Sequence, residues 1–306
     1  MASVSRTSET TVRTSESPRF RPLSRLRDLF SFREILMNLV RKELKVKYTR
    51  SALGAAWSML NPVLYLAVFS FVFAFVLPSK MPAFPVYLLS GLVAWNMFSG
   101  SLTLAVRSVI DNTSLVKKVY FPKEILPLSS VGTSLVDFAL QAVVLVVFMV
   151  IFGYAFLGVN TLLFPLAVVA LVMFTTAMSL WVAGLNVTYR DTQHLLSLTL
   201  LAWFWLTPIV YPSALLQEKL SDVNGMNLFP LYLLNPMADI VFGFQRAFYK
   251  TVSPIGEDGV PVQVLVDMSV GELAVLLCGV IVGSTFVLLA CWRTFFRMSG
   301  DFAEEL

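Results

Sequence analysis

Apolar and polar positions divide this chain into long, nearly uncharged runs separated by short polar stretches. Most of the runs reach the roughly 20 residues that a helix needs to cross the hydrocarbon core of a bilayer. The pattern therefore predicts an all-α integral membrane protein with six transmembrane helices, over residues 53–77, 86–108, 126–152, 161–187, 195–211 and 271–292.

The fifth run is the shortest, and its end carries two prolines, Pro208 and Pro212, so we expect an irregular outer end. Another apolar stretch, 228–249, follows it. One interpretation is a seventh span, and the other is two short helices that dip into the outer leaflet. The second is favoured, because helices broken at membrane depth must be buried in protein or line a cavity. The interruptions are Pro230, Pro236, Asp239 and Arg246.

An amphipathic helix is predicted before the first run, over 32–48. Ser31 and Glu34 have the spacing of a capping box, which predicts a helix start there. Such a helix lies in a membrane interface with its basic face toward the headgroups; a helix that binds a soluble partner is the alternative. Residues 1–21 are rich in Ser, Thr and Arg and predict a disordered cytoplasmic tail.

Composition supports the membrane class. Hydrophobic residues make up 57% of the chain and charged residues 14%, and the mean hydropathy is +0.76. Ordinary soluble domains have about 45–50% and about 25%. A soluble enzyme, a disordered protein and a disulfide-stapled secreted domain are therefore excluded.

The distribution of basic residues predicts the orientation. With six spans and a cytoplasmic N-terminus, 19 of the 23 Lys and Arg residues fall on the cytoplasmic side. That bias is typical of membrane proteins, and it predicts that both termini lie in the cytoplasm. We expect a multi-pass protein of the cell (inner or plasma) membrane. Because the basic charge faces the inner leaflet, we expect no nucleic-acid partner.

Catalytic and metal-binding patterns are missing from the sequence. There is no G-x-x-x-x-G-K-[ST] phosphate loop, so we do not expect this chain to hydrolyse ATP or to be an enzyme. The single histidine, His194, has no Cys or carboxylate cluster around it, which predicts no metal site. We expect no cofactor in this chain.

Two patterns inside the predicted spans concern helix contacts. Asp137 is the only acidic residue well inside a span, and Gln141 follows one turn later. An intramembrane carboxylate is a functional candidate, but a hydrogen bond between helices is favoured over a proton relay, because a secondary transporter usually needs further groups and repeats. Gly279 and Gly283 form a G-x-x-x-G pattern, which predicts close helix approach.

The loop between the second and third runs predicts a short amphipathic helix over 113–121. Its apolar side chains have nothing within the loop to bury them. A knob that docks a cytoplasmic partner is one interpretation, and a helix resting on lipid is the other. The apolar residues are Leu115, Val116, Val119 and Tyr120.

Three stretches in combination resemble the transmembrane (permease) subunit of type-2 ABC transporters that export lipid-linked polysaccharide, such as O-antigen, teichoic acid or galactan. The similarity extends over about residues 30–295. It is carried by 41–62 with Trp57 and Asn61-Pro62, by the loop 115–127, and by 186–191 followed by 203–212 and 234–236.

The resemblance implies how such a protein works. Two copies of a domain covering 22–306 would pair around a channel and bind two cytoplasmic ABC ATPase subunits, which hold the Mg-ATP. The substrate would be a glycan on polyprenyl pyrophosphate. The coupling residues would be Leu115, Val116, Lys117, Lys118, Val119, Tyr120 and Phe121, and the region 212–250 would form short outer gate helices that include Pro230, Asn235, Pro236 and Asp239.

Aromatic residues at helical spacing are candidates to line the channel, because sugars stack on flat rings. They fall four positions apart on one stripe of each helix. Membrane-interface belts are the ordinary explanation for such rings. The candidates in the first run are the aromatic Trp57, Tyr65 and Phe69 with the polar Asn61 between them, and those in the fifth are Trp203 and Tyr211 with Thr207 between them.

Other functions stay open at this stage. The same fold could export a teichoic acid, a small drug or a lipid. A membrane-embedded glycosyltransferase or acyltransferase would need paired carboxylates or a loop histidine, and a secondary transporter would work without ATP.

Overall fold

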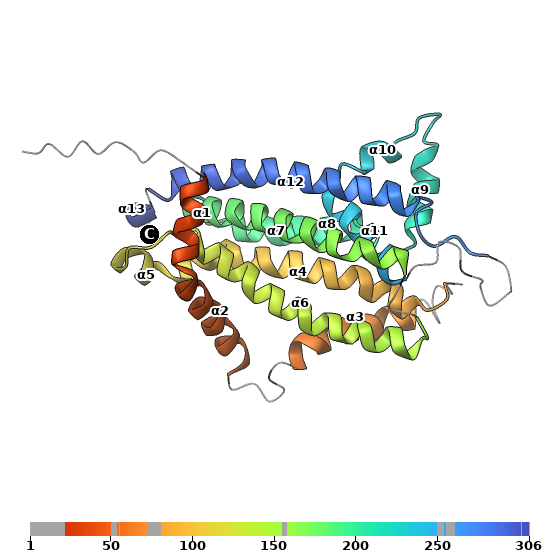
Figure 1. Ribbon diagram of the computed structural model, residues 1–306, viewed down its shortest axis with the longest axis horizontal. Coiled ribbons are helices and arrows are strands. Elements are labelled where there is room, and N and C mark those ends of the chain that lie inside the picture. Colours follow the sequence, from red (N-terminus) through yellow and green to blue (C-terminus); the bar gives the residue numbers. More distant parts are fainter. Residues whose placement is uncertain are drawn as a thin grey trace, which may run out of the picture.

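The computed structural model describes residues 22–49, 54, 56–72, 81–154, 158–249, 254, 261–300 and 302–305. In these ranges every named secondary-structure element is a helix, which confirms the all-α class. Long helices run side by side as a bundle, and short helices gather at its two ends (Figure 1). The predicted tail, 1–21, lies outside the described residues.

Four helices among the described residues are long and apolar enough to cross a membrane. They coincide with four of the predicted runs. They are α4 (Phe84–Asp111), α6 (Ile125–Ile151), α7 (Leu163–Thr188), which the 3-10 turn η2 (Val159–Leu162) precedes, and α12 (Val270–Met298).

The other two predicted spans give shorter helices, α3 (Ala56–Phe71) and α8 (Thr192–Leu206), of 16 and 15 residues. Residues 53, 55 and 73–77 of the first run lie outside the described part. The end of the fifth run is irregular, as predicted, and α8 ends at Leu206, before the predicted bound of 211. It ends there because Thr207 precedes a proline and is extended, with φ −105° and ψ 130°. The count of six spans stays a prediction.

The core lies around α4 and α7, and α11 (Pro236–Phe248) is inserted beside them. Gly243 of α11 makes this insertion possible. A Cβ atom there would lie 2.9 Å from Leu277 Cδ1 and 3.1 Å from Ala167 Cβ. The glycine therefore lets α11 approach both α7 and α12.

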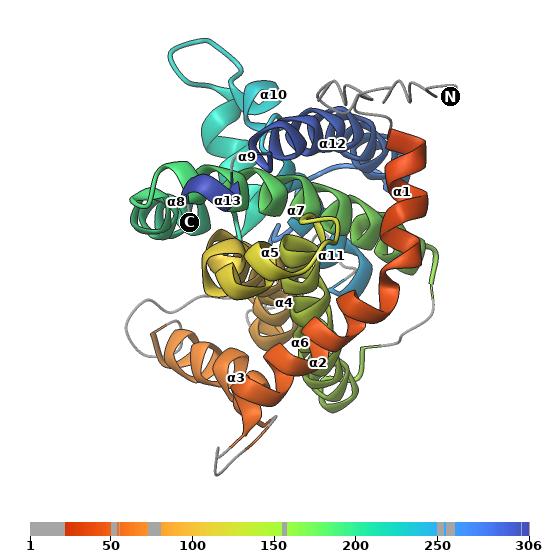
Figure 2. The ribbon, with the colours of Figure 1, turned by 90° about the vertical axis from the view of Figure 1, so that its left-hand side faces the viewer.

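At one end of the bundle, α1 (Pro22–Ser31) and α2 (Arg33–Tyr48) cross the long helices (Figure 2). The predicted capping box is wrong. The Ser31 hydroxyl donates to the carbonyl of Asp28 at 2.7 Å, and Phe32 occupies the N-cap of α2 without a side-chain bond. Because the chain is already helical before Ser31, its hydroxyl bonds back to the preceding turn.

Two of the remaining short helices, α5 (Thr113–Lys118) and α13 (Phe302–Glu305), lie at the same end of the bundle as α1. The other two, α9 (Ser213–Ser221) and α10 (Phe229–Tyr232), lie at the opposite end. The apolar stretch 228–249 is therefore divided between the four residues of α10 and the 13 of α11. It is no continuous seventh span.

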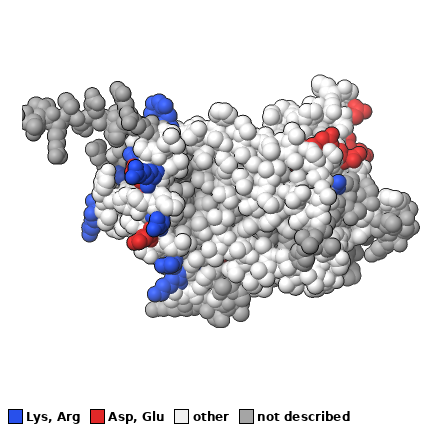
Figure 3. Space-filling model, viewed as in Figure 1, with Lys and Arg blue, Asp and Glu red and all other residues white. Residues whose placement is uncertain are grey.

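Charged side chains separate along the bundle. In the view of Figure 3, Lys and Arg gather at the end that carries α1, α2 and α5. Most of the Asp and Glu side chains visible in this view lie at the opposite end of the bundle. The middle of this face shows no charged side chain. An uncharged band between charged ends is the surface expected for a protein in a bilayer.

Candidate coupling surface and transport path

Helix α5 presents an exposed knob on two buried anchors. The helix has six residues and is shorter than the predicted 113–121, because Val119 is already extended. Val116 and Phe121 are buried in an apolar cluster with Val109 and Trp292. Between these anchors the chain projects outward, and the side chain of Tyr120 is 94% exposed. We call this knob Lys117–Tyr120.

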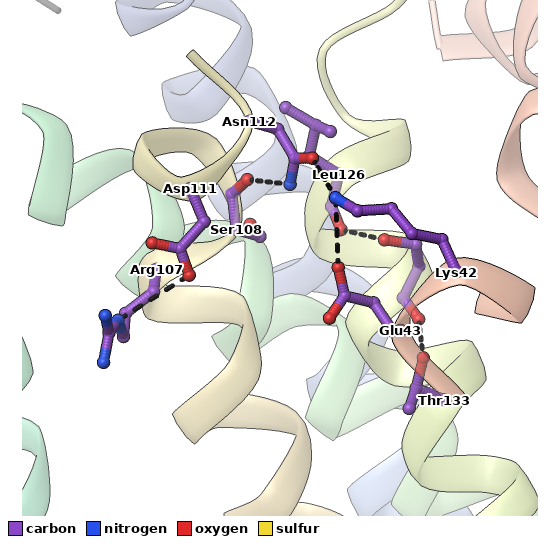
Figure 4. Close-up of polar contacts among 9 residues, drawn as sticks. Lys42, Glu43, Arg107, Ser108, Asp111, Asn112, Leu126 and Thr133 are labelled. Carbon is purple, nitrogen blue, oxygen red and sulfur yellow. Dashed lines mark hydrogen bonds and ion pairs between the residues drawn. The ribbon is translucent and has the colours of Figure 1, made fainter. Parts of the chain in front are cut away.

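The knob is tied to the amphipathic helix through Asn112, a buried residue at the junction of α4 and α5. Lys42 Nζ donates to Asn112 Oδ1 at 2.8 Å, and Asn112 Nδ2 donates to the carbonyl of Ser108 at 2.9 Å (Figure 4). The Asn112 side chain therefore links α2, through its amide oxygen, to α4, through its amide nitrogen. No local pattern in the sequence indicates this bridge, because Lys42 and Asn112 are 70 positions apart.

The C-terminal segment contacts the same region. Lys123 Nζ donates to the carbonyl of Ser299 and lies 5.5 Å from the centroid of the Phe302 ring. Phe302 is buried and packs edge-on against Phe295, with the ring centroids 5.4 Å apart. Helix α13 therefore lies beside the loop that carries the knob.

On α3, the structure leaves one predicted ring at the surface. The Tyr65 side chain is exposed and stacks on the half-buried Phe69, with ring centroids 6.2 Å apart and planes 14° from parallel. Trp57 and Asn61 lie on the same helix, but their side chains are outside the described part.

The predicted stripe on α8 turns mostly inward. Trp203 Nε1 donates to Asn235 Oδ1 at 2.9 Å, and the indole packs edge-on against Phe98, with centroids 5.2 Å apart. Thr207 is buried and its hydroxyl donates to the carbonyl of Trp203. Tyr211 is half-buried and its hydroxyl donates to the carbonyl of Trp205 at 3.0 Å.

The exposed ring of α8 is Trp205, which sequence reasoning missed. It lies on the same exposed face as Leu198 and Leu201. A stripe drawn at four-residue spacing from Trp203 follows the inward face, and a residue two positions along points about 200° away. Helical spacing places Leu198, Leu201 and Trp205 on one face of α8, but it does not show which face of the helix is exposed.

Helices α10 and α11 bring some of the predicted gate residues together. Asn235 is the N-cap of α11, and its Oδ1 accepts from the backbone N–H of Met237 as well as from Trp203. Pro236 occupies the first helical position. A cavity of about 620 Å³ lies between α8 and these helices, lined by Thr199, Ala202, Trp203, Leu206, Leu231, Tyr232, Leu234, Asn235 and Pro236.

Two predicted gate residues lie elsewhere. Pro230 is exposed on α10. Asp239 is buried in the first turn of α11, and its Oδ1 has no hydrogen-bond partner in the described part of the chain. Neither lines the cavity.

Asp137 makes the inter-helix contacts that the sequence favoured. Lys47 Nζ lies 2.7 Å from its Oδ2, and the Tyr48 hydroxyl donates to its Oδ1 at 2.8 Å. Both partners come from the last turn of α2. One turn along α6, Gln141 accepts from Asn96 Nδ2 of α4 at 2.8 Å. The carboxylate therefore fastens α2 to the bundle.

Known proteins similar to this chain are membrane transport components. A family model described as "ABC-2 type transporter" matches residues 35–243. The O-antigen export system permease protein RfbA of Myxococcus xanthus is 35% identical over 245 residues, which cover 80% of this chain and 90% of that protein. A protein of the same name from Klebsiella pneumoniae is 32% identical over 215 residues, 70% and 80% of the two chains. The polysialic acid transport protein KpsM of Escherichia coli is 24% identical over 177 residues, 56% and 67%.

Proposed function

This chain belongs to the ABC-2 type transporter family, and on that premise we propose that it is the permease subunit of an ATP-driven polysaccharide exporter. It is a transport component rather than an enzyme. The proposed cargo is a cell-envelope glycan on polyprenyl pyrophosphate, such as O-antigen or galactan, moved from the cytoplasm across the inner membrane. The relatives described above are named for O-antigen export or polysialic acid transport, which favours a polysaccharide over a teichoic acid, a small drug or a lipid.

The observation that carries the proposal is the exposed knob Lys117–Tyr120. Membership of the family implies a separate ABC ATPase subunit. An exposed apolar ring held on buried anchors is the kind of residue that binds in a pocket of a partner protein. We infer that two ATPase subunits bind the knobs of two permease copies. Mg-ATP is bound and hydrolysed on the ATPase subunits.

The surfaces also support the proposed arrangement in the membrane. We propose a membrane domain over 22–306 with six spans, both termini in the cytoplasm, and α9 to α11 as outer gate helices. The segregation of basic side chains to the end with α1, α2 and α5 supports this orientation (Figure 3).

A homodimer around a channel is the proposed assembly. Helices α3 and α8 flank α4 on one side of the bundle (Figure 2). They carry exposed apolar side chains that two copies could share, among them Leu64, Tyr65 and Val68 of α3 and Leu198, Leu201 and Trp205 of α8. In this arrangement Trp57, Asn61, Tyr65, Phe69, Trp203, Thr207 and Tyr211 stay the predicted channel set, and Tyr65 is the described member most open to a cargo.

Replacing the apolar knob side chains tests the coupling role. The double variant Val119→Asp, Tyr120→Ala should insert normally, because neither side chain is buried. It should lose co-purification with the ABC ATPase and lose export of surface glycan. The matched control, Val159→Asp with Leu162→Ala, changes two exposed side chains at the other end of the bundle and should keep both. Equal ATPase binding by the two double variants would contradict the proposal.

A further inference from the structure

A polar crevice lies between α3, α4 and α6, apart from the predicted aromatic stripes. It is a cavity of about 540 Å³, within the range of about 300–1,000 Å³ typical of ligand pockets. The end of α2 closes one side of it. Its lining is Lys47, Leu64, Asn96, Ser99, Gly100, Thr103, Leu104, Ser134, Asp137 and Gln141.

The crevice lies at membrane depth, where polar groups are costly. Asp137 is 12 positions from the start of α6 and Asn96 is 12 positions from the start of α4, which places both about 18 Å along their helices. Polar side chains inside a membrane face the bundle or a water-filled cavity, and they mark pathways for substrates and ions. Seven of the ten lining residues have polar side chains.

One polar group of the lining, the Ser134 hydroxyl, makes no hydrogen bond within the described part of this chain. The Ser134 side chain is 2% exposed. A buried hydroxyl without a partner costs free energy. Gly100, opposite it on α4, has no side chain to cover the hydroxyl, whereas a Cβ atom at this position would be in van der Waals contact with Ser134 Oγ, at 3.6 Å.

The chemistry of the lining selects the ligand. Its one cation, Lys47, already forms an ion pair with Asp137 at 2.7 Å, so the crevice offers no unbalanced positive charge to a phosphate. The crevice offers hydroxyls, amides and small apolar surfaces to a ligand. The hydroxyls belong to Ser99, Thr103 and Ser134, the amides to Asn96 and Gln141, and the apolar surface to Gly100 and Leu104. That combination suits an uncharged, polyhydroxylated ring.

We propose that this crevice binds a sugar residue of the transported glycan, with Ser134 as a hydrogen-bonding partner. The inference rests on the proposed export of a polysaccharide. It gives the cargo a polar contact on α4 and α6, in addition to any ring on α3 or α8. The last turn of α2 forms part of the wall through Lys47, so the amphipathic helix contributes to the site.

Ser134→Ala separates a binding role from a structural one. Removing a buried hydroxyl that lacks a partner in the described chain should leave the thermal stability of the protein unchanged or raise it. Loss of one hydrogen bond to the sugar should reduce export of surface glycan roughly two- to tenfold. The matched control is Ser179→Ala on α7, where the Oγ is likewise buried and without a described partner but does not line the crevice. Unchanged export by Ser134→Ala would overturn the proposal.

A second measurement detects the cargo directly. Leu104 lines the crevice and is exposed, so it is replaced by the photo-reactive p-benzoylphenylalanine in the full transporter in cells; the exposed Phe286 of α12 is the control position. Irradiation should attach glycan-sized adducts at position 104 only, and only in cells whose glycan synthesis is intact. No adduct at 104, or the same adduct in cells with the first glycosyltransferase deleted, would contradict a glycan ligand.

The two proposals fail in different ways. If the chain exports no polysaccharide, deleting its gene leaves surface glycan unchanged. If only the crevice proposal is wrong, the deletion abolishes surface glycan, yet Ser134→Ala exports normally and position 104 captures no glycan.

Discussion

At the scale of single residues, the contacts that organise this protein join positions far apart in sequence. Asn112 is bonded to Lys42, and the hydroxyl of Tyr87 donates to the carbonyl of Tyr211 at 2.6 Å. Local patterns cannot reveal such pairs, because nothing in the neighbourhood of either residue depends on the other. Residue types pointed to Asp137 and Gln141 correctly, but not to their partners.

The bridge from Lys42 to Asn112 predicts a difference between two lysines of the same helix. Lys42→Met leaves a buried amide oxygen without this donor, at a cost of about 1–3 kcal/mol. Lys45→Met removes an exposed lysine and should change stability by less than about 0.5 kcal/mol. Thermal unfolding in detergent compares the two melting temperatures. Equal melting temperatures would show that the bridge contributes nothing.

The two tryptophans of α8 should differ in what they lose. Trp203→Leu removes a hydrogen bond and edge-on ring contacts, so it should destabilise the protein by about 2 kcal/mol or more. Trp205→Leu changes an exposed ring on the face that we propose two copies share around the channel, so the protein level should stay normal while export of surface glycan falls. Trp205→Phe should keep export, because a flat ring remains.

Membrane levels by immunoblot and surface glycan on the same cells separate these effects. Normal export by Trp205→Leu would place this ring outside the transport path.

At the scale of elements, the apolar runs predicted four long helices, with most ends within three residues and the end of α12 six residues short, as well as the irregular end of α8. They did so because length and apolar composition are local properties. Helix α1 and the shortness of α5 were not predicted. The length of α5 depends on which side chains find a buried surface, whereas α1 has no buried residue. Val116 and Phe121 end up buried, whereas Tyr120, equally apolar in pattern, is exposed.

Glycine patterns show the same limit. Gly279 and Gly283 form the predicted G-x-x-x-G, yet nothing in the described chain lies within 4 Å of a Cβ atom at either position. Close approaches occur instead at Gly132 of α6, where a Cβ atom would lie 2.9 Å from Val40, and at Gly243 of α11, both outside any such motif.

Helix α11 should therefore be sensitive at position 243. Gly243→Ala forces Leu277 or Ala167 to move and should cost about 1–3 kcal/mol. Gly279→Ala, in open space on α12, should be neutral or slightly stabilising, because alanine is the better helix former. Melting temperatures of the two purified variants test this. A destabilised Gly279→Ala variant with an unaffected Gly243→Ala variant would reverse the assignment.

At the scale of the whole molecule, the segregation of charge predicts which end faces outward. A cysteine replacing Leu234, whose side chain is 74% exposed, should react with a membrane-impermeant maleimide added to intact cells. A cysteine replacing Tyr120 should react only after the membrane is opened. Both are introduced into a chain whose own Cys278 and Cys291 are replaced by Ala. Labelling of position 120 in intact cells would invert the topology.

The proposed function of this chain is the export of a polysaccharide made by other proteins. The most direct measurement compares surface glycan with the internal pool of lipid-linked glycan in cells that lack the gene. We predict that surface glycan is lost while the internal pool rises. The wild-type chain should restore both, and Val119→Asp with Tyr120→Ala should restore neither. Unchanged surface glycan, or loss of the internal pool together with the surface glycan, would contradict export as the function.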